Sequence, residues 1–377
     1  MPPEVRGILT ATQAVETAQA IASVQLGDGC IPWEDRRHAD PWNHVEAAMA
    51  LDVAGLHEAA ARAYRWLARQ QRVDGSWAAG HQDGLEEPFT DANFCAYAAT
   101  GVWHHFLASG DCDFLRDAWP MVEAAVECVL TLQAPGGEIW WARDASGRPW
   151  PGALVTSCSS ICKSLECAAA IATVLGRSRR AWRQARRALQ AAVLAGGPVF
   201  EDKARWAMDW YYPVLGGACR GDAADARLAE RWDTFVVHGL GVRCVADRPW
   251  VTVAESCELV LALDAVGCRA DARRVFSWLV PLRCPDGHYW TGITFPESEP
   301  WPEERPTWTS AAVLLAADAL AGGSRTAGLF KHAERAHSRR FLELPGGERA
   351  PEDVERRLPP LRRAAEDVVD DEEAASA

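Results

Sequence analysis

The segment Asp286–Ser310 reads DGHYWTGITFPESEPWPEERPTWTS and places tryptophans, glutamates and prolines in one loop. Loops usually carry small polar residues at the surface, so this composition predicts the rim of a binding site. The first residues, DGHYW, repeat a pattern found earlier in Asp28–Trp33 (DGCIPW) and Asp74–Trp77 (DGSW). The last residues, Pro306–Trp308, open a predicted helix. A turn that recurs along the chain indicates a repeat architecture.

Helical periodicity dominates the rest of the chain. Long Ala-, Leu- and Arg-rich segments repeat their apolar residues every 3.6 positions, whereas strand patterns are nearly absent. Twelve helices are predicted, at residues 9–25, 42–54, 57–71, 90–108, 112–133, 158–175, 179–195, 203–214, 222–238, 251–266, 269–283 and 307–321.

These helices alternate in character. The first member of each pair is amphipathic and charged, as in residues 57–71, whereas the second is apolar along most of its length, as in residues 251–266. An amphipathic helix covers a surface and an apolar one is buried. Six outer and six inner helices predict an all-α fold, an (α/α)6 barrel, over residues 1–343. The long loops all precede inner helices, so we expect the site at the N-termini of those helices.

Composition sets further expectations. The net charge of -13 argues against nucleic-acid binding, and no apolar run is long enough to span a membrane. The 12 cysteines form no CxxC pairs and lie in helical patterns, which predicts core thiols and no metal or cofactor. Without a signal-peptide pattern, a cytoplasmic protein is expected. Residues 344–377 are rich in Pro, Arg and Glu and predict a disordered acidic tail.

The chain holds 18 tryptophans against 5 tyrosines. Such a surplus is typical of sites that stack sugars or isoprenoids, although a large helical core also uses tryptophan. The expected partner is a small molecule or an oligosaccharide. The predicted binding residues lie near the starts of inner helices or in the loops before them; they are Trp33, Trp42, Asn43, His44, Trp77, Asn93, Trp140, Asp209, Trp210, Trp290 and Trp308.

Several carboxylates are candidates for acid–base chemistry. Asp91 and Glu255 lie in the first turn of inner helices, where simple capping is an equal alternative. Asp209 could pair with Arg205 one turn earlier. Glu138 and Glu297 lie in loops, where solvated charge is the alternative. Hydrolysis of a glycosidic bond needs two carboxyl groups, about 6.5–9.5 Å apart in inverting enzymes.

Two families share parts of these patterns. The run from Trp66 to Trp77 (WLARQQRVDGSW) resembles the QW repeat of terpenoid cyclases and prenyltransferase β subunits, with weaker copies at 25–33, 133–140 and 278–290. This resemblance implies an α/α toroid. The protonating DxDD run and the Asp/Cys/His zinc set of those families are absent from the sequence.

The second resemblance is to six-hairpin glycosidases of the glucoamylase type. Residues 101–120 are similar to their third-to-fifth helix region, and Phe295–Ser298 followed by Pro306–Ala312 is similar to the segment that carries their catalytic base. By this match Glu297 is the base. The sugar clamp of the family is replaced by Trp42–Val45, and its paired acidic glutamates are missing near Glu138.

The sequence therefore leaves three candidates for the general acid, which in order of preference are Glu255, Glu138 and Asp91. Glu255 leads because apolar walls at the start of an inner helix could keep it protonated. The sequence favours an inverting glycoside hydrolase. The alternatives are a prenyltransferase-like or cyclase-like toroid that binds an isoprenoid, and a catalytically inactive glycan-binding barrel.

Overall fold

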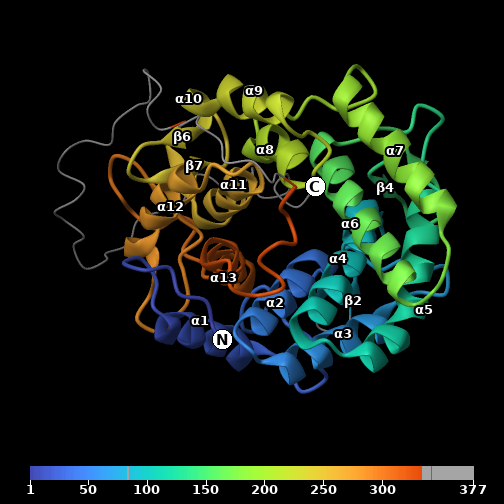
Figure 1. Ribbon diagram of the computed structural model, residues 1–377, viewed down its shortest axis with the longest axis horizontal. Helices are drawn as coiled ribbons and strands as arrows, with labels where there is room; N and C mark the ends of the chain where they lie inside the picture. Colours follow the sequence, from blue (N-terminus) through green and yellow to red (C-terminus); the bar gives the residue numbers. More distant parts are fainter. Residues whose placement is uncertain (83–84, 333–340, 342–377) are drawn as a thin grey trace.

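The computed structural model describes residues 1–82, 85–332 and 341 and has two concentric rings of helices (Figure 1). The inner ring consists of α2 (Pro41–Val53), α4 (Ala92–Ser109), α6 (Val155–Val174), α8 (Ala207–Leu215), α11 (Val253–Ala265) and α13 (Thr307–Ala321). The outer ring consists of α1 (Ala11–Val24), α3 (His57–Gln70), α5 (Cys112–Leu130), α7 (Arg180–Ala195), α9 (Asp222–Glu230) with α10 (Trp232–Phe235), and α12 (Arg269–Ser277). Each inner helix packs against the next, and α13 packs against α2, so the ring is closed.

This arrangement confirms the predicted (α/α)6 barrel and its alternation of helix types. Every residue of α11 is buried, whereas α3 buries only one stripe, which includes Tyr64 and Trp66. A helix buried on all sides is mostly apolar, and a covering helix needs one apolar face. None of the helices in the described ranges is long and apolar enough to cross a membrane.

Two expected helices break up before their predicted ends. The segment 222–238 divides into α9 and α10 and then enters β6 (Val236–Val237). The segment 269–283 leaves the α-helix after Ser277 and continues as the 3-10 turn η1 (Val280–Leu282), where Pro281 offers no N–H for an α-helical hydrogen bond.

Short strands hold the loops at the N-terminal ends of the inner helices. β1 (His81–Gln82) pairs with β2 (Leu85–Glu86); β3 (Thr90–Asp91), β4 (Ala142–Arg143) and β5 (Pro149–Trp150) form a second antiparallel sheet. β6, β7 (Gly241–Arg243), β8 (Trp250–Thr252) and β9 (Gly292–Thr294) form a third, also antiparallel. Strands of two or three residues are too short to leave an alternating pattern in the sequence.

The repeated turn of the sequence joins neighbouring outer helices. The side-chain amide of Gln71 donates to the carbonyl of Gly75 in its own turn and to that of Met121 in α5, at 2.9 Å each. The equivalent amides of Gln25 and Gln133 make the same pair of bonds, to Gly29 and Ala59 and to Gly137 and Ala185. The last copy of the repeated turn contains Gly287. Its carbonyl accepts the hydroxyl of Thr17 in α1 at 2.8 Å, and this bond closes the outer ring.

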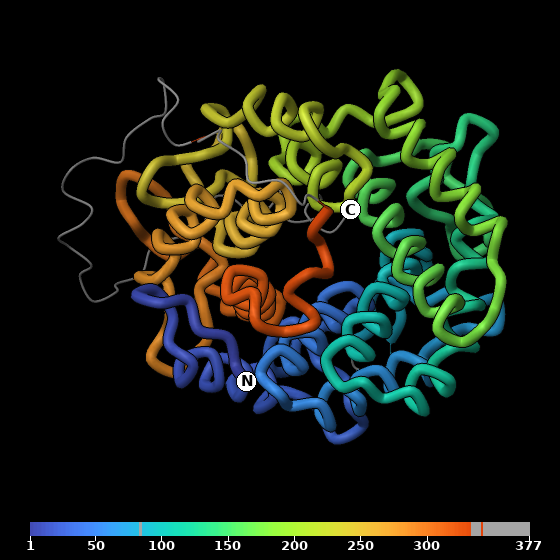
Figure 2. Tube along the Cα trace, in the orientation of Figure 1, coloured from blue at the N-terminus to red at the C-terminus, as the bar shows by residue number. Residues whose placement is uncertain are grey.

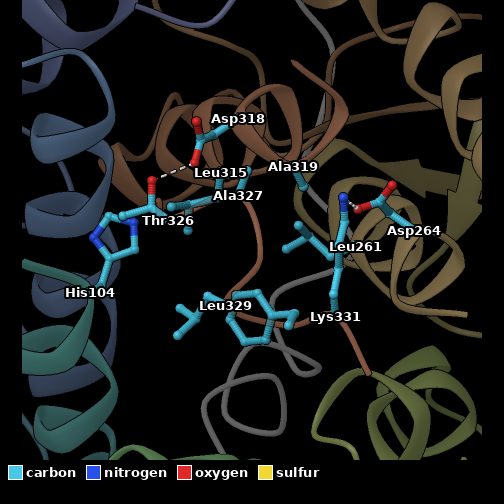
Figure 3. Close-up of a pocket in the computed structure, with 11 residues that line it drawn as sticks. His104, Leu261, Asp264, Leu315, Asp318, Ala319, Thr326, Ala327, Leu329 and Lys331 are labelled. Atoms are coloured by element: carbon cyan, nitrogen blue, oxygen red, sulfur yellow. Dashed lines mark hydrogen bonds and ion pairs between the residues drawn. The ribbon is translucent and has the colours of Figure 1, made fainter. Parts of the chain in front are cut away.

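The end of the barrel where the inner helices terminate is filled by the chain that follows α13 (Figure 2). Thr326 donates to the Asp318 carboxylate at 2.6 Å, and Lys331 pairs with Asp264 at 3.1 Å (Figure 3). Lys163 of α6 donates to the carbonyl of Leu329 at 3.1 Å. The strands and long loops gather at the opposite end of the barrel, where the inner helices begin. The predicted tail, 344–377, and the domain boundary at 343 lie outside the described residues.

Candidate active site

Five buried carboxyl groups form a row near the N-terminal ends of the inner helices α2, α4 and α11. Asp40 and Glu46 belong to the start of α2, Asp91 precedes α4, and Glu255 and Glu258 lie in the first two turns of α11. Each is at most 6% exposed. Neighbours in the row are close enough for charge repulsion: Asp40 acts on Asp91 and on Glu46, and Glu46 and Glu255 both act on Glu258. Carboxyl groups at this depth are costly unless they are hydrogen-bonded or protonated.

Asp40 and Asp91 cap the helices that follow them. One oxygen of Asp40 accepts the backbone N–H of Asn43 at 2.9 Å, and the other accepts the Asn43 side-chain amide. Asp91 accepts the N–H groups of Asn93 and Phe94 at 2.7 and 3.0 Å. Burial raises the pKa of Asp91 to about 7 and also raises the pKa of Asp40, despite these bonds. Asp91 thus caps α4, which was the alternative to a catalytic role.

Glu46 and Glu258 are anchored by aromatic donors at the barrel axis. Tyr97 and the Trp308 indole donate to Glu46 at 2.7 and 3.0 Å. Tyr212 donates to Glu258 at 2.5 Å, and Tyr211 donates to its other oxygen. Burial raises the pKa of Glu46 to about 7 and holds the pKa of Glu258 well above its usual range. Neither glutamate was a sequence candidate, although a glutamate inside an apolar inner helix was a usable signal.

Three of the predicted tryptophans lie beside this row. Trp42 stacks on Tyr97 with ring centroids 4.6 Å apart and an interplanar angle of 8°. Trp33 lies 5.9 Å from Trp308 and donates its indole N–H to Glu304 at 3.1 Å. Glu304, one of the acidic residues of the segment Asp286–Ser310, thus holds the Trp33 ring in place.

Other predicted tryptophans are part of the core. Trp77 is 1% exposed and donates to the carbonyl of Leu67 at 2.8 Å. Trp210 donates to the carbonyl of Arg227 at 2.8 Å and stacks on Phe235. Both indoles donate to backbone carbonyls on the outward side of the inner helices. The structure therefore does not bring Trp77 and Trp210 to the row of carboxyls.

His44 also points away from the barrel axis. Its ring nitrogens bond to the N–H of Ile31 and the carbonyl of Ala63, both at 3.0 Å, and burial lowers its pKa to about 4. These contacts tie α2 to the outer helix α3. Asn43, in contrast, is half-buried and donates its side-chain amide to the Asp40 carboxyl.

The remaining polar candidates are placed around the rim. The Asn93 side-chain oxygen is buried and has no hydrogen-bond partner among the described residues. Asp209 accepts from the Thr156 hydroxyl at 2.9 Å, and burial raises its pKa. Arg205 forms its ion pair with Asp247 at 2.9 Å, so the expected pairing with Asp209 is not what holds this carboxylate.

Glu138, Trp140 and Trp290 lie in the repeated turns. Glu138 is buried and Trp140 is half-buried against the core. Trp290 is half-buried beneath the guanidinium of Arg305, 5.5 Å from the ring centroid. Glu297 is exposed and lies on the turn after β9. The structure does not place Glu297 within the buried row, and its assignment as base stays a prediction.

Comparisons with solved structures identify the fold. A wild-type glycosidase superposes with a TM-score of 0.66 over 82% of this chain and 96% of its own, at 18% identity. A glycosidase in complex with glucose gives 0.65 over the same shares, also at 18% identity. A D-mannose isomerase gives 0.61 over 81% and 95%, at 10% identity. At these identities the likeness establishes the fold alone.

The sequence comparison is more specific, although no protein-family model matches the chain. The MMP endo-(1,4)-3-O-methyl-alpha-D-mannosidase of Mycolicibacterium hassiacum is 51% identical over 330 residues, 87% of this chain and 92% of that protein. The protein is therefore a glycoside hydrolase built on an (α/α)6 barrel. Within that class the chain belongs to the family of this endo-mannosidase. The prenyltransferase, cyclase and inactive-barrel alternatives are not favoured.

Proposed function

We propose that the protein is an endo-acting mannosidase that cleaves (1,4) bonds within chains of 3-O-methyl-α-mannose, with Glu255 as general acid and Asp40 as general base. The observation that carries this proposal is the row of buried carboxyls between α2 and α11. The substrate is that named for the 51% identical relative.

Glu255 suits the role of acid because it lies in the first turn of α11, is 5% exposed, and is enclosed by an apolar helix. Its neighbour Glu258 has both oxygens held by tyrosine hydroxyls. Glu255 would give its proton to the glycosidic oxygen as the bond from that oxygen to the anomeric carbon breaks. An acid near the leaving oxygen in a dry site contributes most when its proton is retained at working pH.

Asp40 suits the role of base because it lies on α2, which is separated from α11 by α13 around the ring. It would take a proton from a water molecule as that water's oxygen bonds to the anomeric carbon. The Asn43 amide donates to its carboxylate and partly offsets the burial that raises the pKa of Asp40. We prefer Asp40 to Asp91 because it is the more exposed of the two carboxyls, at 6% against 3%, and its neighbour Asn43 is half-buried. Inversion of configuration requires a water between the sugar and the base, so in this proposal Asp40 and Glu255 flank the bound sugar with room for that water.

Three variants test these roles on a 3-O-methylmannose oligosaccharide. We expect Glu255→Gln and Asp40→Asn each to lower kcat by a factor on the order of 10³, because each removes a proton-transfer group. Glu297→Gln is the matched exposed control and should stay within about twofold of the wild type. Proton NMR of the first product should show the inverted anomer.

Two results would change the assignment. Loss of activity in Glu297→Gln with normal turnover in Asp40→Asn would make Glu297 the base, as the glucoamylase resemblance implies. A wild-type enzyme that releases no products from the methylated chain would refute the substrate.

A further inference from the structure

Three aromatic side chains, Phe89, Trp141 and Trp150, pack together at the rim of the barrel and form what we call the aromatic wall. Phe89 stacks on Trp150 with centroids 5.8 Å apart and an interplanar angle of 19°. Trp141 meets Trp150 edge-on at 5.1 Å and Phe89 at 6.3 Å. All three are half-buried, so each keeps part of its surface in contact with solvent.

The register of the second sheet places this wall beside the row of carboxyls. Asp91 of β3 pairs with Ala142 of β4, and Ala142 pairs with Trp150 of β5. Side chains that are directly opposite in adjacent strands lie on the same face of a sheet, so Trp150 shares the face of Asp91. Phe89 precedes Asp91 by two residues and therefore returns to that face as well. Phe89 and Trp150 thus lie on the Asp91 face of the sheet, at the α4 end of the row, and Trp141, one residue before Ala142, contacts both rings.

A second aromatic group lies at another part of the mouth. Trp33 and Trp308, together with His38 stacked on Trp33 at 5.7 Å, belong to the α2 and α13 side. The carboxyl row runs between α4 and α11 through α2, so it has aromatic surface on more than one side. An enzyme that cuts inside a chain must hold sugar units on both sides of the broken bond.

We propose that Phe89, Trp141 and Trp150 form a distal subsite that binds 3-O-methylmannose units away from the cleaved bond. This inference rests on the proposed function, since it concerns recognition of the same chain. A flat aromatic ring stacks on the C–H face of a sugar, and an O-methyl group adds apolar surface that a plain hydroxyl lacks. The wall therefore selects for methylated chains as well as for long ones.

The experiment compares a long and a short 3-O-methylmannose oligosaccharide with the full-length enzyme. For Trp150→Ala we expect KM for the long chain to rise about tenfold, the effect of losing about 1.4 kcal/mol of contact. The short chain, which covers only the cleaved bond, should keep its kcat and KM. The matched control is Trp103→Ala, a half-buried tryptophan near the other end of α4 that contacts Phe106. It should change KM for neither chain.

Methylation gives a second readout. The wild type should bind the methylated long chain several-fold more tightly than the unmethylated (1,4)-mannose chain of equal length, and Trp150→Ala should reduce this preference. A role in packing the sheet alone would lower the melting temperature and leave both the length dependence and the methyl preference intact. That result would overturn the subsite.

Direct binding by calorimetry separates this inference from the proposed function. Wild-type binding that Trp150→Ala weakens, without any cleavage, would refute the mannosidase proposal and support the subsite. Cleavage by the wild type with unchanged long-chain binding in Trp150→Ala would refute the subsite and leave the mannosidase proposal standing. An absence of both binding and cleavage would refute both.

Discussion

The indole N–H of Trp308 donates a hydrogen bond to the carboxyl of Glu46, 3.0 Å away, and so joins the last inner helix to the first. The same carboxyl accepts the hydroxyl of Tyr97 at 2.7 Å, and Tyr97 carries the stacked ring of Trp42. One buried glutamate thus fixes three aromatic side chains at the mouth of the barrel. This contact lies where α13 packs against α2 to close the ring, and it also holds part of the aromatic surface.

Replacing Trp308 by Phe tests this contact. Trp308→Phe keeps an aromatic ring but removes the donor, so one oxygen of Glu46 loses its partner. We expect the free energy of unfolding to fall by about 1–2 kcal/mol and KM for the methylated chain to rise several-fold. Chemical denaturation and steady-state kinetics measure the two effects.

The control is Trp77→Phe, because the Trp77 indole also has one buried acceptor but lies away from the mouth. It should lose similar stability and keep the wild-type KM. Equal KM values for the two variants would contradict a positioning role for Trp308.

The raised pKa of Glu46 makes stability fall as pH increases. Burial raises this pKa to about 7 from 4.5 in the unfolded chain, so the folded state holds the proton more tightly. The stabilising effect is complete below the unfolded pKa and is lost as pH rises through the folded pKa. At about 1.4 kcal/mol per pKa unit, ionisation of Glu46 lowers the free energy of unfolding by an amount on the order of 3 kcal/mol. Asp91, also raised to about 7, acts in the same direction.

Denaturation at about pH 5.5 and about pH 8 should therefore show a less stable protein at the higher pH. Glu46→Gln cannot ionise, so it should reduce this difference while lowering stability at pH 5.5 by disturbing the bonds to Tyr97 and Trp308. An identical pH difference in the variant and the wild type would show that Glu46 is not the titrating group.

The barrel could be predicted from the sequence because the signals for it lie within single helices and turns. The apolar inner helix at 253–265 and the amphipathic outer helix at 57–70 differ in composition, and that difference reflects burial alone. The short turns end at glycines that adopt positive φ, such as Gly55 and Gly110. These features need no knowledge of distant contacts.

The site was less readable because it depends on which side of an inner helix faces the axis. Trp42 and His44 are two residues apart on α2, yet one stacks at the mouth and the other bonds to the outer ring. The repeated turn placed Trp33 at the mouth but Trp77 in the core. Glu46 and Glu258 were missed because their tyrosine and tryptophan donors come from other helices. The assignments of Glu255 and Glu297 remain predictions.

The repeated glycines predict a steric effect that can be measured. A Cβ on Gly75, which has a φ of 88°, would lie 2.2 Å from the carbonyl oxygen of Ala124 in α5. We expect Gly75→Ala to cost about 3 kcal/mol or more, because backbone strain adds to a clash that cannot relax without moving α5. The melting temperature and the denaturation midpoint report the loss.

Gly55→Ala is the matched control. Gly55 has a φ of 84° but no atom within 4 Å of the position that a Cβ would occupy. It should cost only about 1 kcal/mol, the strain of the backbone alone. Equal costs at the two positions would mean that the turn does not dock on α5 as described.

At the closed end of the barrel, Asp52 is a buried acceptor for histidines from two other helices. The ring nitrogens of His57 and His105 lie 2.9 Å from its oxygens. Burial alone would raise the pKa of Asp52, but hydrogen bonds from His104, His105 and His57 outweigh it and hold this pKa below its usual range. The stability that Asp52 supplies is therefore present above the unfolded pKa of about 4 and is lost as pH falls further.

Asp52→Asn should lower the free energy of unfolding at neutral pH by about 2–4 kcal/mol, since it removes a buried charge that its neighbours were arranged to bind. His57→Ala removes one half-exposed partner and should cost about 1 kcal/mol or less. Because this cluster lies at the end opposite the carboxyl row, both variants should keep the wild-type kcat and KM at temperatures where they remain folded. A fall in kcat without a fall in stability would instead connect the closed end to the site.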